Sequence, residues 1–227
     1  MRSIGHRRAT IRCGRPAAPG SGATRRAARR SIHEPEPIAT REDHARLIAD
    51  AARYGWHATL KAPFRLAEGE SEERLDEALQ DFAAQRSAFP APRLVVSSLA
   101  GFLAVVPAEP CPPLSALAEK TVRAFDRFRA PPTEEELARR QAVGLTPRQQ
   151  SLLATWGYPY VMDEWRFHMT LTARLPSEHE KPLRIALAER FAYALAAPLA
   201  FRELALYVEP APGAPFRLLR RYPFKAG

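Results

Sequence analysis

The pattern of apolar and polar positions predicts the same order of elements twice: a strand, an amphipathic helix and two more strands. In each copy the helix has apolar residues three and four positions apart, and the strands are short apolar runs bounded by Gly, Pro or Ser. The first copy is expected to comprise a strand at 56–61, a helix opened by Ser71, and strands at 93–99 and 102–107. The second is expected to comprise a strand at 165–172, a helix opened by Ser177, and strands near 201–209 and 216–224.

Between the two copies the pattern is helical. Thr133 and Thr146 each precede a Glu or Gln by three positions, which is the signature of a capping box, and Gly157 ends the second of these helices. Strands that follow one another through hairpins and helices indicate an α+β fold with mostly antiparallel sheets. We expect a bilobal domain over 34–227, in which the two copies of this internal repeat pack as lobes around a central cleft.

The first 33 residues differ from the rest of the chain. They hold nine Arg, no Asp or Glu, and no apolar periodicity, which predicts a disordered basic tail. Such a segment is either a genuine transit-like extension or the product of a misassigned start or a shifted reading frame. The rest of the chain holds 25 basic and 25 acidic side chains, so its body is neutral. Nucleic acid is therefore expected to bind only weakly and through the tail.

The cysteine count and the hydropathy favour a cytoplasmic protein. Cys13 and Cys111 form neither a disulfide framework nor a zinc-binding spacing. The most apolar stretch, 94–106, is shorter than the ~20 residues of a membrane-spanning helix, and no secretory signal is present. No membrane partner is expected, and the oligomeric state stays open.

The first strand of each copy carries the same short motif. The motif reads Trp56-His57-Ala58-Thr59-Leu60 in the first copy and Phe167-His168-Met169-Thr170-Leu171 in the second. Because side chains alternate faces along a strand, His57, Thr59 and Lys61 are expected to share one face, as are His168 and Thr170. A single His-x-Thr motif is common by chance. On its own, each copy could be a structural histidine on a strand, hydrogen-bonded at the surface of a lobe. Its repetition at equivalent places favours a functional pair.

Two such pairs suit the cleavage of a phosphoester. One neutral imidazole accepts a proton while the other, protonated, donates one to the leaving oxygen, and an unperturbed pKa of ~6.5 allows both forms near neutral pH. His57 and His168 are the candidate catalytic residues, and Thr59 and Thr170 are placed to donate to the phosphate oxygens. Lys61 either contacts the phosphate or is solvated. The motif supplies no carboxylate for a metal, so neither a metal nor another cofactor is expected.

At these residues the sequence resembles the 2H phosphoesterase superfamily, whose branches include the bacterial RNA 2′,5′-ligase and cyclic phosphodiesterases. Longer stretches look like the branch often encoded with phosphonate-utilisation genes, and the resemblance covers 34–227. These stretches are 53–64 (RYGWHATLKAPF), 128–131 (FRAP), 156–161 (WGYPYV) and 166–172 (RFHMTLT). The resemblance implies a bilobal fold with catalytic His57 and His168. It also implies a small cyclic or linear phosphoester substrate from phosphonate breakdown, such as a ribosyl cyclic phosphate.

The sequence departs from the family pattern at its first strand, and two other functions are compatible with the motifs. The family opens with a short apolar strand, and residues 1–33 contain nothing comparable, so one sheet is expected to lack a strand. The nearest rival is an enzyme that processes RNA 2′,3′-cyclic or 2′,5′ linkages with the same histidines, which should carry basic or aromatic groove residues. The other rival is a non-catalytic module that binds a phosphate ligand or RNA through the basic arm.

Overall fold

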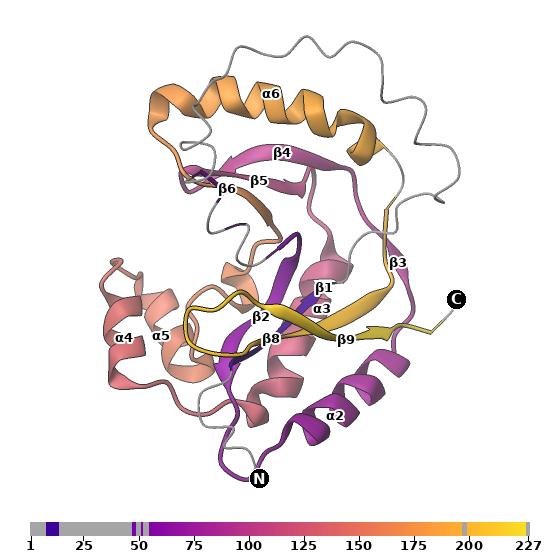
Figure 1. Cartoon of the computed structure of the whole chain (residues 1–227), viewed down its shortest axis with the longest axis vertical. Coiled ribbons are helices and arrows are strands. Elements are labelled where there is room, and N and C mark those ends of the chain that lie inside the picture. The colour runs from indigo at the N-terminus through magenta and orange to yellow at the C-terminus, as the bar shows by residue number, and fades with distance from the viewer. Residues whose placement is uncertain (1–7, 14–46, 49–50, 52–54, 197–198, 226–227) are drawn as a thin grey trace.

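The computed structural model describes residues 8–13, 47–48, 51, 55–196 and 199–225, which form an α+β fold of two lobes (Figure 1). The strands are β1 (Arg8–Cys13), β2 (Ala58–Arg65), β3 (Phe89–Pro90), β4 (Leu94–Leu99), β5 (Phe102–Pro107), β6 (Met169–Arg174), β7 (Ala200–Phe201), β8 (Glu203–Glu209) and β9 (Arg217–Pro223). The helices are α2 (Glu72–Ala84), α3 (Pro112–Phe125), α4 (Glu134–Gln141), α5 (Pro147–Trp156) and α6 (Ser177–Ala196), with short 3-10 turns η1 (Asp126–Phe128) and η2 (Met162–Glu164). Over these ranges no helix is both long and apolar enough to cross a membrane.

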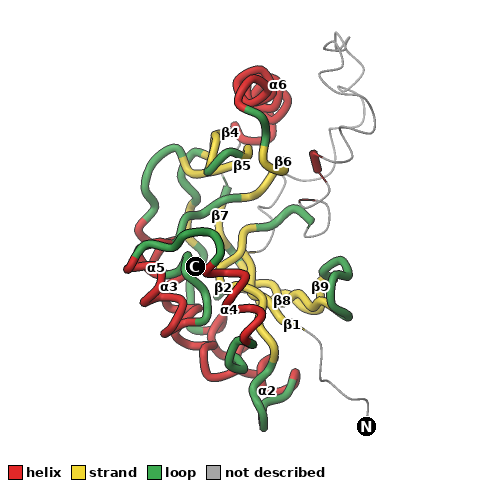
Figure 2. Tube along the Cα trace, turned by 90° about the vertical axis from the view of Figure 1, so that its left-hand side faces the viewer, coloured by secondary structure: helices red, strands yellow, loops and turns green. Residues whose placement is uncertain are grey.

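Three antiparallel sheets organise the described strands. The larger lobe contains a four-stranded sheet in the order β2-β1-β8-β9, and the smaller lobe contains a three-stranded sheet in the order β4-β5-β6. Strands β3 and β7 form a short pair of their own. Helices α2 and α3 pack on the four-stranded sheet, and α6 packs on the three-stranded sheet. Figure 2 shows α6 at the opposite end of the molecule from α2.

Each main sheet is built from both halves of the chain. The motif strand β2 lies in one sheet with the β8–β9 hairpin of the second half, and the motif strand β6 lies in one sheet with the β4–β5 hairpin of the first half. The expectation that each copy of the repeat forms its own lobe is therefore wrong. Local patterning predicts where strands lie, but it does not say which distant strand pairs with which.

The expected disordered tail is also wrong for the residues of β1. This strand lies in the centre of the four-stranded sheet, paired with β2 on one side and β8 on the other. Ala9 and Ile11 are buried in the apolar core, while Thr10 and Arg12 are buried on the opposite face. The sheet therefore has its first strand. Residues 1–7 and 14–33 of the expected tail lie outside the described residues.

The local signals in the sequence correspond to well-formed elements. Leu75, Leu79 and Phe82 are the buried face of α2, as their spacing predicts. The capping boxes at Thr133 and Thr146 are both formed, each with reciprocal side-chain and backbone hydrogen bonds. These helix starts are fixed by residues three positions apart, which explains why they can be predicted from sequence alone.

Candidate functional site

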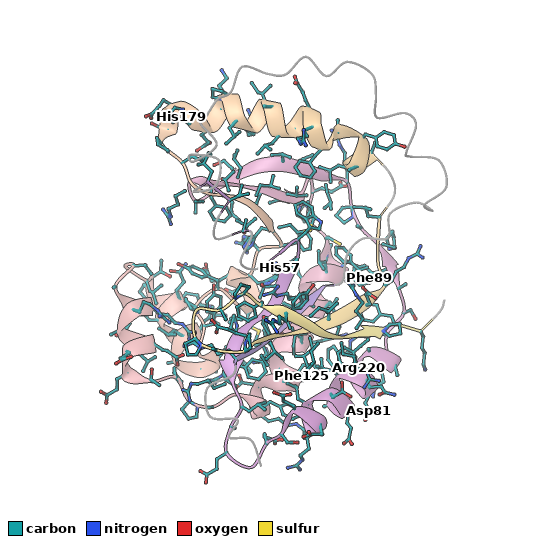
Figure 3. All side chains as sticks on the ribbon, in the orientation of Figure 1. His57, Asp81, Phe89, Phe125, His179 and Arg220 are labelled. Carbon is teal, nitrogen blue, oxygen red and sulfur yellow. The ribbon has the colours of Figure 1, made fainter. Side chains whose placement is uncertain are left out.

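The two motif histidines occupy equivalent places in the two sheets. His57 directly precedes β2 and His168 directly precedes β6, so each lies at the entry to its strand. Thr59 and Thr170 follow two residues later, within the strands, and all four side chains are half-buried. Figure 3 shows His57 on the side of the larger lobe that is turned toward the three-stranded sheet.

Both imidazoles are oriented by the same hydrogen bond. His57 Nδ1 lies 2.7 Å from the carbonyl oxygen of Gly55, and His168 Nδ1 lies 2.8 Å from that of Arg166, two residues upstream in each case. A carbonyl oxygen only accepts, so Nδ1 carries the proton in both rings. Nε2 is consequently the nitrogen that carries no proton while each ring is neutral.

The environment of His57 favours its neutral form. Burial lowers its pKa to about 4, and the positive charges of Arg12 and His168 contribute to the lowering while the Gly55 carbonyl opposes it. Its Nε2 lies 3.1 Å from the Thr59 hydroxyl, which can donate to the neutral ring. A histidine that stays neutral at neutral pH is suited to accept a proton.

Contacts in both directions connect the two motif segments. The indole nitrogen of Trp165, three residues before His168, donates to the carbonyl oxygen of Thr59 over 3.1 Å. Trp56, next to His57, stacks on Phe191 of α6 with ring centroids 5.5 Å apart and planes 4° from parallel. Each motif segment is thus held against the opposite lobe. This arrangement places the two histidines within electrostatic reach of each other.

A profile of the family described as "Protein of unknown function (DUF1045)" matches residues 59–217, which include Thr59 and His168. The chain belongs to the DUF1045 family. Among curated proteins it is 46% identical over 182 residues to ribose 1,5-bisphosphate phosphokinase PhnN of Janthinobacterium sp. (strain Marseille). It is 41% identical over 174 residues to the protein of the same name from Laribacter hongkongensis (strain HLHK9). The matches cover 78% and 76% of this chain but only 40% of each relative, so the chain spans about two fifths of their length.

Among solved structures the fold is similar to E. coli LigT. The complex of LigT with 3′-AMP matches with a TM-score of 0.41 and 13% identity, covering 97% of this chain and 99% of that one. The apo form of LigT matches with a TM-score of 0.37 and 13% identity, covering 96% and 98%.

Two residues of this DUF1045 chain that sequence analysis did not single out lie beside His57. Arg12 is fully buried on β1, directly opposite Thr59 in the strand register. Its guanidinium carbon lies 4.2 Å from the centroid of the Tyr207 ring and 4.8 Å from that of Phe216, so two aromatic faces hold the cation. The His57 and Tyr207 ring centroids are 6.5 Å apart. Arg12 was missed because it lies in an Arg-rich segment, although Ala9 and Ile11 alternate with polar residues there as in a strand.

A β-bulge in β2 changes which side chains share a face. Ile11 pairs with Lys61 and the next residue, Arg12, pairs with Thr59, so one step on β1 corresponds to two steps on β2. Leu60 is the extra residue, and a bulge of this kind interrupts the alternation of side chains. The expectation that Lys61 extends the face of Thr59 is therefore wrong.

In this DUF1045 chain Lys61 contacts α3 and η1 and not the histidine motifs. Its side chain is 4% exposed, and Nζ donates to Asp126 Oδ1 over 3.1 Å and to the Val122 carbonyl over 3.4 Å. Burial lowers its pKa to about 8 although Asp126 opposes the shift. The structure does not bring Lys61 together with the histidines, and we do not include it among the groups that contact phosphate at that site.

The candidate site combines the groups of an acid–base pair with the fixed positive charge of Arg12. Two imidazoles, two threonine hydroxyls and one guanidinium come from three strands of two sheets. Within the part of the chain that the structure describes, no three His, Cys, Asp or Glu side chains lie close enough together to hold a metal ion. The arrangement can receive an anionic group, remove a proton from one side of it and deliver a proton to the other.

Proposed function

We propose that this chain hydrolyses a small phosphoester without a metal, with His57 as the general base and His168 as the general acid. The observation that carries the proposal is the shared geometry of the two rings. Each ring donates Nδ1–H to the carbonyl two residues upstream, which leaves Nε2 as the atom for proton transfer to or from the substrate. The low pKa of His57 supports its assignment as the base.

In the proposed reaction His57 Nε2 takes a proton from a water molecule, whose oxygen forms a bond to phosphorus. The bond from phosphorus to the leaving oxygen breaks, and His168 Nε2 protonates that oxygen. Thr59 and Thr170 donate to the non-bridging oxygens as charge accumulates there, and the fixed charge of Arg12 favours the anion. Proton exchange with water then returns both rings to their starting states.

The substrate class that we propose is a cyclic phosphoester on a small sugar, such as a ribosyl cyclic phosphate formed during phosphonate catabolism. The curated relatives are named for ribose 1,5-bisphosphate, a ribose that carries two phosphates. A cyclic phosphate needs one water and two proton transfers to open, which the two histidines supply. Opening the ring yields a phosphomonoester with no loss of the sugar.

A substrate screen tests this proposal. The purified chain would be incubated with EDTA and a ribosyl 1,2-cyclic phosphate, a 2′,3′-cyclic nucleotide or a 2′,5′-linked dinucleotide, with products read by phosphorus NMR. We expect the sugar cyclic phosphate to be opened most efficiently. Faster cleavage of the two RNA-type substrates would replace the proposal with RNA end processing. Phosphoryl transfer from ATP to ribose 1,5-bisphosphate without hydrolysis of any substrate would overturn it.

A further inference from the structure

A second group of cations gathers on the far side of β2, where the sequence stretches FRAP and WGYPYV meet. A small open pocket there is lined by Lys61 and Arg65 of β2, Arg129 after η1, and Arg140 of α4. Trp156, Gly157 and Tyr158 close it from the end of α5. These stretches carry the family resemblance, and the proposed phosphoester chemistry gives them no role.

The positive charges in this cluster outnumber the negative ones. Asp126 pairs with Lys61 and receives two hydrogen bonds from Arg129, at 2.8 and 3.1 Å. A second carboxylate, Glu136, pairs with Arg8 at 2.6 Å and Arg65 at 3.6 Å. Burial opposes ionisation of both carboxyls, but the Thr133 backbone N–H at Glu136, the hydrogen bonds at Asp126 and the nearby positive charges outweigh it and lower both pKa values, so both groups are ionised.

With Arg140 included, five cations surround two carboxylates in the described residues. Lys61, Arg129 and Glu136 are largely buried, with side chains 4%, 16% and 12% exposed. The buried Lys61 and Arg129 are balanced by Asp126 and Glu136. The surplus of positive charge lies on Arg8 and Arg65, whose side chains are 29% and 30% exposed, and on Arg140, and of these Arg65 and Arg140 line the pocket. These partly exposed charges can meet an anion that arrives from solvent.

The guanidinium of Arg129 packs closely against the backbone of Gly157. Gly157 has φ +69°, and a Cβ there would lie 2.7 Å from Arg129 Nη1. The left-handed conformation favours glycine at this position, and any larger residue would displace the Arg129 guanidinium. Arg140 donates to the Gly157 carbonyl and lies 5.5 Å from the Tyr158 ring centroid, so the same turn orients both arginines.

The size of the pocket restricts what can enter it. The pocket offers about 20 Å³ to water-sized groups, room for roughly one of them. A terminal phosphate can place one oxygen in such a space at an open mouth and offer two more oxygens and a second negative charge to the surrounding donors, whereas an internal phosphodiester has only two such oxygens and one charge. Arginine forks and a lysine are the donors that proteins use for terminal phosphates.

We propose that Lys61, Arg65, Arg129 and Arg140 form a second anion site, separate from the histidine pair, which takes the terminal phosphate of a small phosphorylated molecule. The test uses the whole chain and inorganic phosphate as the probe, with affinity measured by calorimetry and by the rise in Tm, at constant ionic strength set with chloride. Arg140→Gln should weaken phosphate binding about tenfold, the loss expected for one charge-assisted hydrogen bond. Arg140→Lys should fall between this variant and the native chain.

The matched control is Arg139→Gln, because Arg139 is the exposed neighbour of Arg140 on the same helix. Arg139→Gln should bind phosphate as the native chain does. Equal losses in Arg139→Gln and Arg140→Gln would show general charge attraction and overturn the site. Loss of binding in His57→Ala would place the phosphate at the histidines instead. Absence of phosphate binding in the native chain, or competition by an oligonucleotide that lacks terminal phosphates, would also overturn it.

Discussion

The indole nitrogen of Trp165 donates a hydrogen bond to the carbonyl oxygen of Thr59 over 3.1 Å, joining the segment before His168 to the strand after His57. We expect this bond to help position His168 relative to His57, although it involves neither ring. Trp165→Phe keeps most of the packing and removes the donor. We expect kcat to fall about tenfold with little change in KM, because misplaced catalytic groups slow chemistry more than binding.

Steady-state kinetics and Tm of Trp165→Phe, measured together, check this role. A lower Tm with an unchanged kcat would mean that the bond stabilises the fold but does not position the histidines.

The pH dependence of turnover follows from the environment of His57. A general base must be neutral, so kcat/KM rises with pH through the pKa of His57 and falls at higher pH, where the proton donor is lost. Because burial and Arg12 lower that pKa from 6.5 to about 4, the acid limb should lie well below pH 6.5. A pH–rate profile in EDTA measures this directly. An acid limb at pH 6.5 or above would contradict the assignment of His57 as the base in this environment.

Arg12 should set the pH at which the acid limb of the pH–rate profile lies. Its permanent charge disfavours protonation of His57, so Arg12→Gln should raise the pKa of His57 and move the acid limb toward higher pH. Arg12→Lys keeps the charge and should leave the limb closer to its native position. The same pH–rate measurement on both variants distinguishes an electrostatic role from a structural one, since a structural role would lower the rate at every pH without moving the limb.

Lys61 should make stability depend on pH. The pKa of Lys61 is about 8 in the folded chain and 10.5 for an unperturbed lysine, as in the unfolded chain. Between these values the unfolded chain binds more protons, so stability increases as pH rises. The gain from Lys61 across that window is roughly 1–3 kcal/mol. Lys61→Met should lose this rise, whereas Lys120→Met, at an exposed helix position, should keep it. Urea unfolding at pH 7.5 and 10 compares the two. Parallel behaviour of both variants would show that Lys61 titrates as a surface lysine.

The features that sequence analysis predicted are those encoded by neighbours in the chain. The apolar stripe of α2, the capping boxes at Thr133 and Thr146 and the two His-x-Thr motifs all depend on residues two to four positions apart. A short period is visible without knowledge of the fold. The shared Nδ1 bonds to Gly55 and Arg166 follow from the same local geometry.

The features that sequence analysis missed depend on pairing between distant segments. The motif strand of each half pairs in a sheet with the hairpin of the other half. Local patterns do not indicate which distant strand is the partner. The bulge at Leu60 exists only relative to β1, and it directs Lys61 to Asp126 instead of to the face of Thr59. β1 itself has too few residues for its alternation to stand out among arginines.

The hydrolysis rate of a ribosyl cyclic phosphate in EDTA, compared among the native chain, His57→Ala, His168→Ala and His179→Ala, tests the central claim most directly. His179 is an exposed helix histidine and serves as the control. We predict that each of the first two variants loses at least about 100-fold in turnover while remaining folded, the usual effect of removing a general acid or base. His179→Ala should retain native activity. Near-native turnover in either His57→Ala or His168→Ala would contradict the paired-histidine mechanism.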